Sequence, residues 1–331
     1  MQKKNIFQQI IKWVIICLCV VISLALLTVG VLNIAKFAIY SNYYSIKTDL
    51  CKNPGLSDGF VCQGICAYEQ EEKFLVSGYM MDNSPSRIYV TDAENNSYYV
   101  WVTYGSGKAF TGHSGGIAIS GDDAYIASGD NLYAIPLPSI IDASNDDSVS
   151  ISKIIPVNNE ASFVYADEDY IYVGEYHDGK SIFTDHPYET PDGTYYAIVS
   201  RYSAKEIKKY HKKNYPTVTP DKIYSIRNNA QGICFTPDGK VVLSTSYGID
   251  DTVYYVYDEA DALDWGEALD DAGVYCLYDH IKEIKAPAMG EDMDYYDGQI
   301  ITLTECASNK YVFGKFFFAD KIVLIDLLTL I

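Results

Sequence analysis

The sequence is poor in positive charge and in histidine. It has 25 Lys and Arg against 44 Asp and Glu, a formal net charge of -19, and only five His among 331 residues. Nucleic acids and anionic lipid surfaces reward clustered cations, so this composition argues against a general affinity for either.

Recognisable catalytic and metal-binding signatures are scarce as well. The chain has no HExxH and no GxGxxG pattern, and no pair of cysteines has the CxxC spacing of structural zinc sites. With so few histidines, a Ser-His-Asp arrangement has no obvious members. We therefore leave catalytic residues unassigned and favour a binding module over an enzyme.

The first acidic residue is Asp49, and an uncharged run from Trp13 to Ala35 precedes it. As a helix, those 23 residues would extend roughly 34 Å, enough for a hydrocarbon core of about 30 Å. Three lysines precede the run, so the positive-inside bias predicts a cytoplasmic tail (1–12), a signal-anchor helix (13–35) and an extracytoplasmic remainder in the plasma membrane. Cleavage as a signal peptide, which would give a secreted form, is the alternative.

Helical periodicity is nearly absent after residue 60. Short alternating runs rich in Tyr, Val and Ile are separated by turn signals instead. "QGICAYEQEEKFLVSGYM" (63–80) and "QGICFTPDGKVVLSTSYG" (231–248) resemble each other, and three further copies start at Gly115, Ala161 and Glu291. In the second strand of each copy one column holds a small residue, namely Ser77, Ala127, Gly174, Ser244 and Thr304.

Four antiparallel strands repeated every 46 to 70 residues are typical of a β-propeller. The sequence therefore predicts an all-β, five-bladed β-propeller over residues 60–331, with six blades as an alternative, preceded by one transmembrane helix. The last copy ends after its third strand, so the linker (36–59) is expected to supply a ring-closing strand around "YYSIKTDL". That strand would bring Cys51 beside the last blade, which makes Cys51 and Cys306 the first candidates for a disulfide; buried free thiols are the alternative.

Polar residues gather where the innermost strands are expected to begin. We expect Gln63, His113, Gln231, Glu291 and Asp292 to line one mouth of the central channel and to bind a polar ligand there. Glu291 and Asp292 are also speculative ligands for Ca²⁺, which takes six to eight oxygens. The alternative is that these side chains cap one another or bind channel water.

Two charged insertions follow the third strands of the third and fourth copies. The basic one contains Lys208, Lys209, Lys212 and Lys213, and its Ser203 and Glu206 form a capping-box pattern that predicts a short helix. One hypothesis is that the acidic one, "DEADALDWGEALDDAG", forms a second helix that pairs with it across the rim; a solvated loop is the alternative for this insertion. The alternatives for the basic insertion are a docking surface for an envelope protein, the membrane or a glycan, or a solvated loop.

The copy at Gln231 looks like a stretch of the five-bladed glutamine cyclotransferases, and the whole of residues 60–331 resembles bacterial β-propellers of the YVTN, SMP-30 and glutamine cyclotransferase type. That resemblance implies the fold and, as an alternative function, a lactonase-, hydrolase- or cyclotransferase-like enzyme that uses the channel mouth, with Ca²⁺ in the SMP-30 case. The catalytic Glu of the cyclotransferases falls on Leu243 here and on Val76 in the first copy. Neither side chain can transfer a proton, so the resemblance is one of architecture. The leading hypothesis is a membrane-anchored propeller that binds a protein, a peptide or a cell-envelope glycan.

Overall fold

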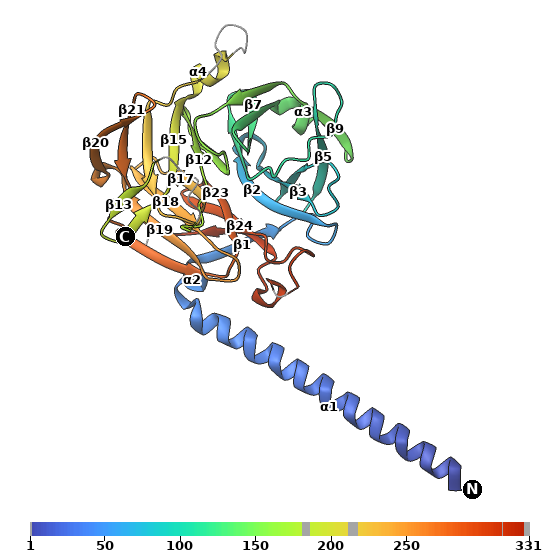
Figure 1. Ribbon diagram of the computed structural model, residues 1–331. Helices are drawn as coiled ribbons and strands as arrows, with labels where there is room; N and C mark the ends of the chain where they lie inside the picture. Colours follow the sequence, from blue (N-terminus) through green and yellow to red (C-terminus); the bar gives the residue numbers. More distant parts are fainter. Residues whose placement is uncertain (1, 181–185, 211–217, 313, 328–331) are drawn as a thin grey trace.

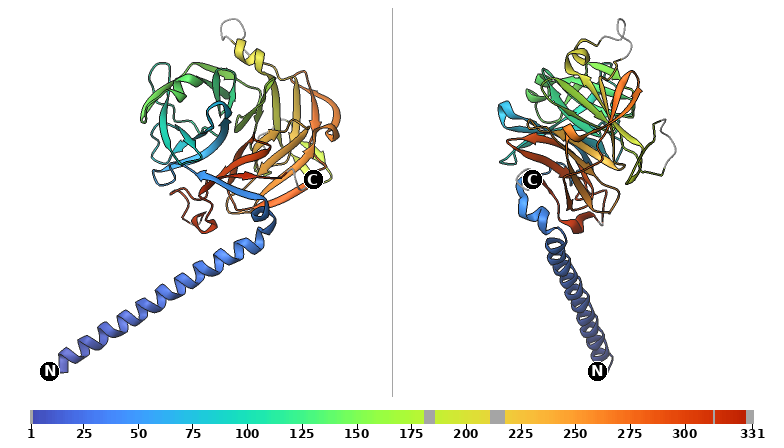
Figure 2. Two further views of the ribbon diagram at one scale, coloured as in Figure 1. Left: turned by 180° about the vertical axis from the view of Figure 1, so that it is seen from behind. Right: turned by 90° about the vertical axis from the view of Figure 1, so that its left-hand side faces the viewer.

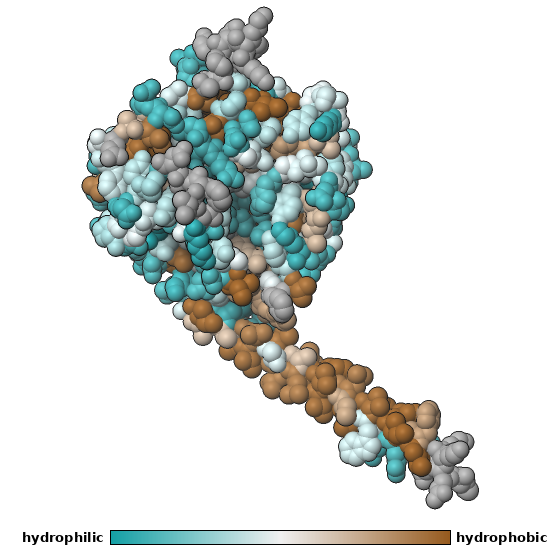
Figure 3. All heavy atoms as spheres, in the orientation of Figure 1, coloured by the Kyte–Doolittle hydropathy of each residue, from teal (hydrophilic) through white to brown (hydrophobic). Residues whose placement is uncertain are grey.

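The chain forms an all-β propeller preceded by one long apolar helix (Figure 1). The computed structural model describes residues 2–327 apart from 181–185, 211–217 and 313. Helix α1 (Gln2–Ile39) projects from the propeller, and its segment Ile6–Ile39 is long and apolar enough to cross a membrane. Figure 3 shows this helix as an apolar rod attached to a mostly hydrophilic body.

Within the described residues, five sheets have four or more strands. The first contains β2 (Phe60–Tyr68), β3 (Lys73–Met80), β4 (Arg87–Asp92) and β5 (Ser97–Tyr104), with β9 (Asp147–Ile151) added parallel to β5. The second contains β6 (Gly116–Ser120), β7 (Asp123–Ser128), β8 (Asn131–Pro136) and β10 (Lys153–Pro156). The third contains β11 (Phe163–Ala166), β12 (Tyr170–Gly174), β15 (Ala197–Ser203) and β16 (Lys222–Ile226), extended by β21 (Ala272–Cys276) and β20 (Leu263–Leu269).

The fourth sheet contains β17 (Ala230–Phe235), β18 (Lys240–Thr245), β19 (Thr252–Asp258) and β22 (Lys282–Ala286). The last contains β23 (Gly290–Tyr296), β24 (Gln299–Thr304), β25 (Lys321–Ile325) and β1 (Lys47–Lys52). Smaller elements are α2 (Ser41–Ile46), α3 (Leu137–Ile141), α4 (Ala204–Lys209), the hairpin β13–β14 (Tyr188–Thr190, Gly193–Tyr195) and the 3₁₀ turns η1 (Glu69–Glu71), η2 (Glu259–Asp261) and η3 (Gly314–Phe317).

The innermost strands contact one another in a closed cycle, β2–β6–β11–β17–β23 and back to β2. This close approach explains the glycine of the repeated "QGIC". A Cβ on Gly64 would lie 2.5 Å from the backbone nitrogen of Ile117 in β6, and one on Gly232 would lie 2.7 Å from Cα of Asp292 in β23. No side chain fits where neighbouring inner strands pass so closely. The repeat therefore marks the two innermost strands that carry it, as the sequence indicated.

The register agrees with the aligned copies. Ser77 lies opposite Gly64, Ala127 opposite Gly116, Gly174 opposite Phe163, Ser244 opposite Gly232 and Thr304 opposite Gly290. The column of small residues thus occupies one position in the second strand of every sheet, next to the inner strand.

The last sheet takes its outermost strand from the N-terminal side of the propeller. β1 pairs antiparallel with β25, so the segment from Lys47 to Lys52 completes the sheet that the C-terminal strands begin. Tyr40 and Tyr43 before it are buried, and the Tyr40 hydroxyl donates to Asp251 Oδ1 at 2.8 Å. The segment after α1 is consequently part of the folded body.

Two expectations about outer elements are wrong. "VYCLYDH" (274–280) does not give the fourth strand of its own unit; it supplies β21, which pairs parallel with β16 of the third sheet, while β22 takes its place. The acidic insertion forms strands β20 and β21 and not a helix. The apolar residues Trp265, Leu269 and Val274 give this insertion a face to pack, which a solvated helix would not need.

The Cys51–Cys306 disulfide is also not formed. Both residues are buried free thiols, as are Cys62, Cys66, Cys234 and Cys276. Cys51 lies on β1, Cys306 follows β24, and β25 lies between these two strands. Two strand spacings of about 4.8 Å exceed the roughly 7 Å limit for a disulfide between Cα atoms.

Candidate functional site

The predicted channel residues lie where three inner strands are irregular. The pairing register shifts between Cys62 and Gly64, between Ala230 and Gly232, and between Gly290 and Met293. Gln63, Gln231 and the pair Glu291–Asp292 occupy these three bulges. Bulges redirect side chains and recur next to functional sites, so the shared irregularity gives these residues a common position at the starts of the inner strands.

Gln63 connects two of the neighbouring strands through hydrogen bonds. Its Oε1 contacts Nε2 of His113, and its Nε2 donates to Glu305 Oε2 at 2.8 Å and to the Cys62 carbonyl at 2.8 Å. Partial burial and the nearby Lys310 ammonium lower the pKa of His113, so its imidazole is neutral at pH 7. We refer to Gln63, His113 and Glu305 as the Gln63 cluster.

Aromatic rings and one cation surround the Gln63 cluster. The Tyr79 ring lies 4.7 Å from that of His113, and Lys310 lies over the rings of Tyr79 and Tyr311 at 4.8 and 4.9 Å and bonds the Tyr79 hydroxyl. The pKa of Tyr311 is raised, first by burial and then by the Glu305 charge. These contacts give the cluster an apolar wall with polar ends, a surface suited to a polar ligand.

Two buried carboxyls lie beside the cluster. Burial, and then the charge of Glu305, raises the pKa of Glu291 well above its usual value, and burial also raises the pKa of Glu305. Burial thus favours the protonated form of both carboxyls over the charged one, and the charge of Glu305 adds to this effect at Glu291. A carboxyl whose pKa is raised in this way is a candidate general acid or base.

Asp292 has different surroundings from Glu291. It is fully buried, its Oδ2 accepts from the Ile117 backbone N–H at 3.3 Å, and its Oδ1 has no hydrogen-bond partner. Burial raises its pKa well above the usual range. Asp292 thus faces β6, whereas the strongest charge neighbour of Glu291 is Glu305.

The residues do not fit a calcium site at Glu291 and Asp292. Their two carboxyls supply at most about four of the six to eight oxygens that Ca²⁺ requires, and they have different partners. Across the described ranges 2–180, 186–210, 218–312 and 314–327, no group of three or more His, Cys, Asp and Glu is arranged to hold a metal ion.

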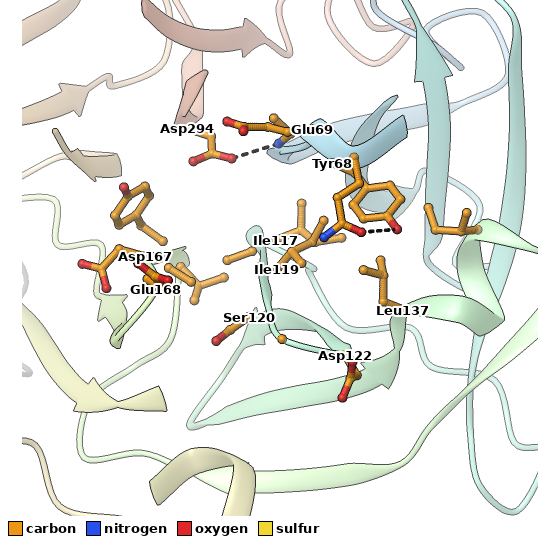
Figure 4. A pocket seen from close by; sticks show the side chains of 18 of the residues that line it. Tyr68, Glu69, Ile117, Ile119, Ser120, Asp122, Leu137, Asp167, Glu168 and Asp294 are labelled. Carbon is orange, nitrogen blue, oxygen red and sulfur yellow. Dashed lines mark hydrogen bonds between the residues drawn. The ribbon is translucent and has the colours of Figure 1, made fainter. Parts of the chain in front are cut away.

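A cavity of about 900 Å³ lies at the other ends of the inner strands. Figure 4 shows it from close by, with Ile117, Ile119 and Leu137 among the apolar lining residues. Seven carboxylates line it and none of its lining residues is Lys, Arg or His: Glu69, Glu71, Asp122, Asp142, Asp167, Glu168 and Asp294. We call it the acidic cavity.

Asp294 lies deepest among these carboxyls. Its Oδ2 accepts from the Ala67 N–H at 2.9 Å, the contact drawn in Figure 4, and its Oδ1 accepts from the Tyr295 N–H at 2.8 Å. Burial raises its pKa to about 7 in spite of these bonds. The cavity therefore becomes more negative as pH rises through neutrality, because Asp294 loses its proton.

Sequence reasoning grouped Gln63, His113, Glu291 and Asp292 at one end of the inner strands, where the structure also has them, and missed several of their partners. That they bind a ligand stays a prediction.

Glu305 did have a signal, because it aligns with Glu175 one position past the small-residue column, which suggests a carboxylate pair. In the structure Glu175 bonds His186 and Glu305 bonds Gln63. Tyr79, Lys310 and Tyr311 gave no signal. Gln231 is half-buried in its bulge, and no hydrogen bond of its side chain is found among the described residues. The acidic cavity did have a signal: the turns after all five inner strands contain Asp or Glu, and those after β2, β6 and β11 contribute acidic residues to the cavity.

Two motif matches that are easily overlooked do not have the structural context that their chemistry needs. "GHSGG" (112–116) matches GxSxG, and Ser114 has φ of 54°, but it leads into strand β6 and its hydroxyl is fully buried. "GEYHDGKS" (174–181) matches a P-loop, yet the chain described from His186 onward leads into strand β13. A nucleophile elbow and a P-loop both require a following helix.

The basic insertion begins as predicted. Helix α4 follows Ser203, although the Ser203 side chain makes no capping hydrogen bond. Lys208 pairs with Asp122 at 3.2 Å and Lys209 with Glu206 at 3.2 Å, while Lys212 and Lys213 lie outside the described residues. Figures 1 and 2 place α4 on the side of the propeller away from α1, so this insertion does not face the membrane that α1 would cross.

No family model and no curated protein matches the chain. Among solved structures it is similar to the PQQ-bound aldose sugar dehydrogenase of Streptomyces coelicolor, with 16% identity over 78% of this chain and 77% of that one and a TM-score of 0.45. The glutaminyl cyclase of Myxococcus xanthus matches with 8% identity over 84% and 94% and a TM-score of 0.44. BamB of Moraxella catarrhalis matches with 8% identity over 80% and 84% and a TM-score of 0.33. The similarity to β-propellers of the cyclotransferase and sugar dehydrogenase type is one of architecture alone.

Proposed function

We propose that this chain is a membrane-anchored, extracytoplasmic β-propeller of five blades that binds a partner protein or peptide through the acidic cavity. The observation that carries the proposal is the lining of that cavity, where seven acidic residues converge. Among the described residues only two of them are paired with a cation, Glu71 with Lys73 and Asp122 at the rim with Lys208. A volume of about 900 Å³ is at the upper end of ordinary ligand pockets and admits several side chains. Under this proposal α1 is the anchor and its lysine-flanked N-terminus lies in the cytoplasm.

The lining favours a basic peptide segment over a neutral glycan. Carboxylates around a concave, partly apolar surface focus a negative potential and attract cations. Lys and Arg side chains can pack their alkyl stems on Ile117, Ile119 and Leu137 while their charged ends reach the rim. A neutral sugar would gain nothing from the charge, and it would have to compete with water for the same oxygens.

The proposal is tested with the full chain in detergent micelles and two short peptides of equal length, one rich in lysine and one rich in glutamate. We expect the lysine peptide alone to bind. Binding should weaken about tenfold when Glu69→Gln, Asp142→Asn and Glu168→Gln are combined, because exposed ion pairs contribute about 0.5 kcal/mol each. The matched control combines Asp82→Asn, Asp250→Asn and Asp279→Asn, which remove the same charge outside the cavity. Equal weakening in both variants would show that only net charge attracts the peptide.

A second candidate function is an enzyme at the Gln63 cluster. The observation that favours it is the Glu291–Glu305 pair, two candidate general acids or bases in one place. The chain would be offered a panel of lactones and of peptides with N-terminal glutamine. We expect turnover lost in Glu305→Gln and retained in Glu71→Gln; no turnover of any compound by the wild type would leave the binding function as the better account.

A further inference from the structure

A second, smaller cavity lies where the anchor helix meets the propeller. It has a volume of about 260 Å³, and its lining includes Lys36, Phe37, Tyr44, Lys47, Phe318 and Lys321. The first two residues belong to the last turns of α1, and η3 of the last sheet packs against this helix. Parts of the chain almost 300 residues apart thus enclose one small space; Figure 2 shows the α1–propeller junction from two further sides.

Cations and aromatic rings alternate around this cavity. The Lys36 ammonium lies 4.5 Å from the centroid of Phe318 and 5.1 Å from that of Phe37, and Lys47 lies 5.6 Å from the Tyr44 ring. Rings of Phe37 and Tyr44 are 4.4 Å apart. Such rings hold an ammonium in place while leaving its remaining donors free for an anion.

The cavity is locally positive in a strongly acidic protein. Lys36, Lys47 and Lys321 face Asp49 and Asp320, and Lys47 is paired with Asp49. Three cations against two carboxylates leave one positive charge, whereas the chain as a whole carries -19. One phosphodiester, with a single negative charge, would neutralise the excess.

The small cavity lies at the point along α1 that would be level with the lipid headgroups. The apolar segment of 34 residues is about 51 Å long at about 1.5 Å per residue, which exceeds a hydrocarbon core of about 30 Å. Centring the uncharged run 13–35 in that core leaves Lys36 and the following residues at the interface, where Tyr and basic side chains concentrate. Apolar side chains in and next to η3, which packs against α1, are exposed: Val312 at 71%, Phe316 at 44% and Phe318 at 38%. This apolar surface is free to enter the interface.

We propose that this cavity binds the phosphodiester headgroup of an anionic phospholipid, with η3 (Gly314–Phe317) and the adjacent Phe318 dipping into the same leaflet. Lys36 and Lys321 contact the phosphate, and Phe316 and Phe318 lie among the upper parts of the acyl chains. The inference rests on the membrane anchoring in the proposed function. It concerns one enclosed site and is compatible with the low general affinity for anionic surfaces that the overall charge indicates.

The test uses the full chain in lipid nanodiscs and separates the anchor from the site. Quenching of Trp13 by brominated acyl chains reports whether α1 is inserted. Phe316→Trp, introduced together with Trp13→Phe, reports whether η3 enters the leaflet. Ile154→Trp in the same background is the control on a distant exposed position. We expect quenching of Trp13 and of the tryptophan at 316, and none at 154.

Headgroup binding is measured by native mass spectrometry after release from nanodiscs of phosphatidylcholine with phosphatidylglycerol. We expect retained phosphatidylglycerol to fall roughly tenfold or more in Lys36→Gln with Lys321→Gln, since each cation near a membrane surface contributes about a factor of five. Lys108→Gln with Lys153→Gln should retain the wild-type amount. A quenched Trp13 with an unquenched position 316, or equal retention in both double variants, would overturn the lipid site alone. An unquenched Trp13 would overturn the anchor and the site with it.

Discussion

The two ends of the propeller channel are built from the same inner strands and differ in how their charges are compensated. At the Gln63 cluster, buried carboxyls are raised in pKa and are met by Gln63, His113 and Lys310. In the acidic cavity, five of seven carboxylates are exposed and the lining residues include no cation. The first end therefore compensates most of its charge internally, with Asp292 Oδ1 as an exception. The second end leaves its exposed carboxylates, apart from the two that are paired with lysines, for a partner to neutralise. The difference indicates which end is organised for chemistry or structure and which for recognition.

The largest expected effect comes from adding a side chain where the inner strands β2 and β6 pass closest to each other. Gly64→Ala places a methyl group against the β6 backbone, so the inner ring must widen at the Gln63 end. We expect the free energy of unfolding to fall by about 3 kcal/mol, the upper range for overpacking a core, measured by urea denaturation of the full chain in micelles. Gly105→Ala is the control, because its new Cβ would meet its nearest atom at an ordinary 3.7 Å. Equal losses in the two variants would contradict the packing argument.

The two copies of "QGIC" should differ in how much stability is lost when their Gln is replaced, and this effect is smaller than that of Gly64→Ala. Gln63→Leu removes the amide that Glu305 and His113 share and leaves a buried carboxyl with fewer partners, so we expect a loss of about 2 kcal/mol in stability. Gln231→Leu, in the equivalent bulge, should change stability by less than about 0.5 kcal/mol, as substitutions away from such networks do. A similar loss in both variants would mean that the bulge, and not the hydrogen bonds, sets the requirement for Gln.

The smallest effect concerns the acidic cavity and depends on pH. The folded pKa of Asp294 is about 7, well above its value in an unfolded chain. Its neutral form is thus favoured by folding, and the stability that it contributes is present in acid and is lost as pH rises from about 4 to 7. We expect Asp294→Asn to flatten the fall in stability over this range by roughly 1 kcal/mol, a value reduced for its partial exposure. Thermal unfolding at several pH values measures this, with Asp297→Asn as the control.

Several features could be predicted from the sequence because they depend on local chemistry. The uncharged run from Trp13 to Ala35 predicts a helix able to cross a membrane, and alternating residues between turn signals predict the strands of a propeller. The spacing of the five copies also placed Gln63, His113, Glu291 and Asp292 at one end, since aligned copies put aligned residues at one level.

Other features depend on which strands become neighbours across the ring. The bond from Gln63 to Glu305 joins residues 242 positions apart, and β21 leaves its own unit for β16 because its apolar face finds a partner there. The absence of a disulfide between Cys51 and Cys306 also depends on strand order, because β25 lies between β1, which carries Cys51, and β24, which Cys306 follows. Sequence spacing reports position along a strand and not distance across a sheet.

Taken by itself, the sequence determined the apolar helix, the repeat and the level of each residue along the channel axis, because these follow from hydrophobic periodicity and turn chemistry within each unit. The tertiary structure alone decided which carboxyls are paired, which are left to face an open cavity, and that Lys36 meets Phe318. The reason is physical: burial, charge coupling and cavities depend on distances between units, and ring closure sets those distances only when all units pack together.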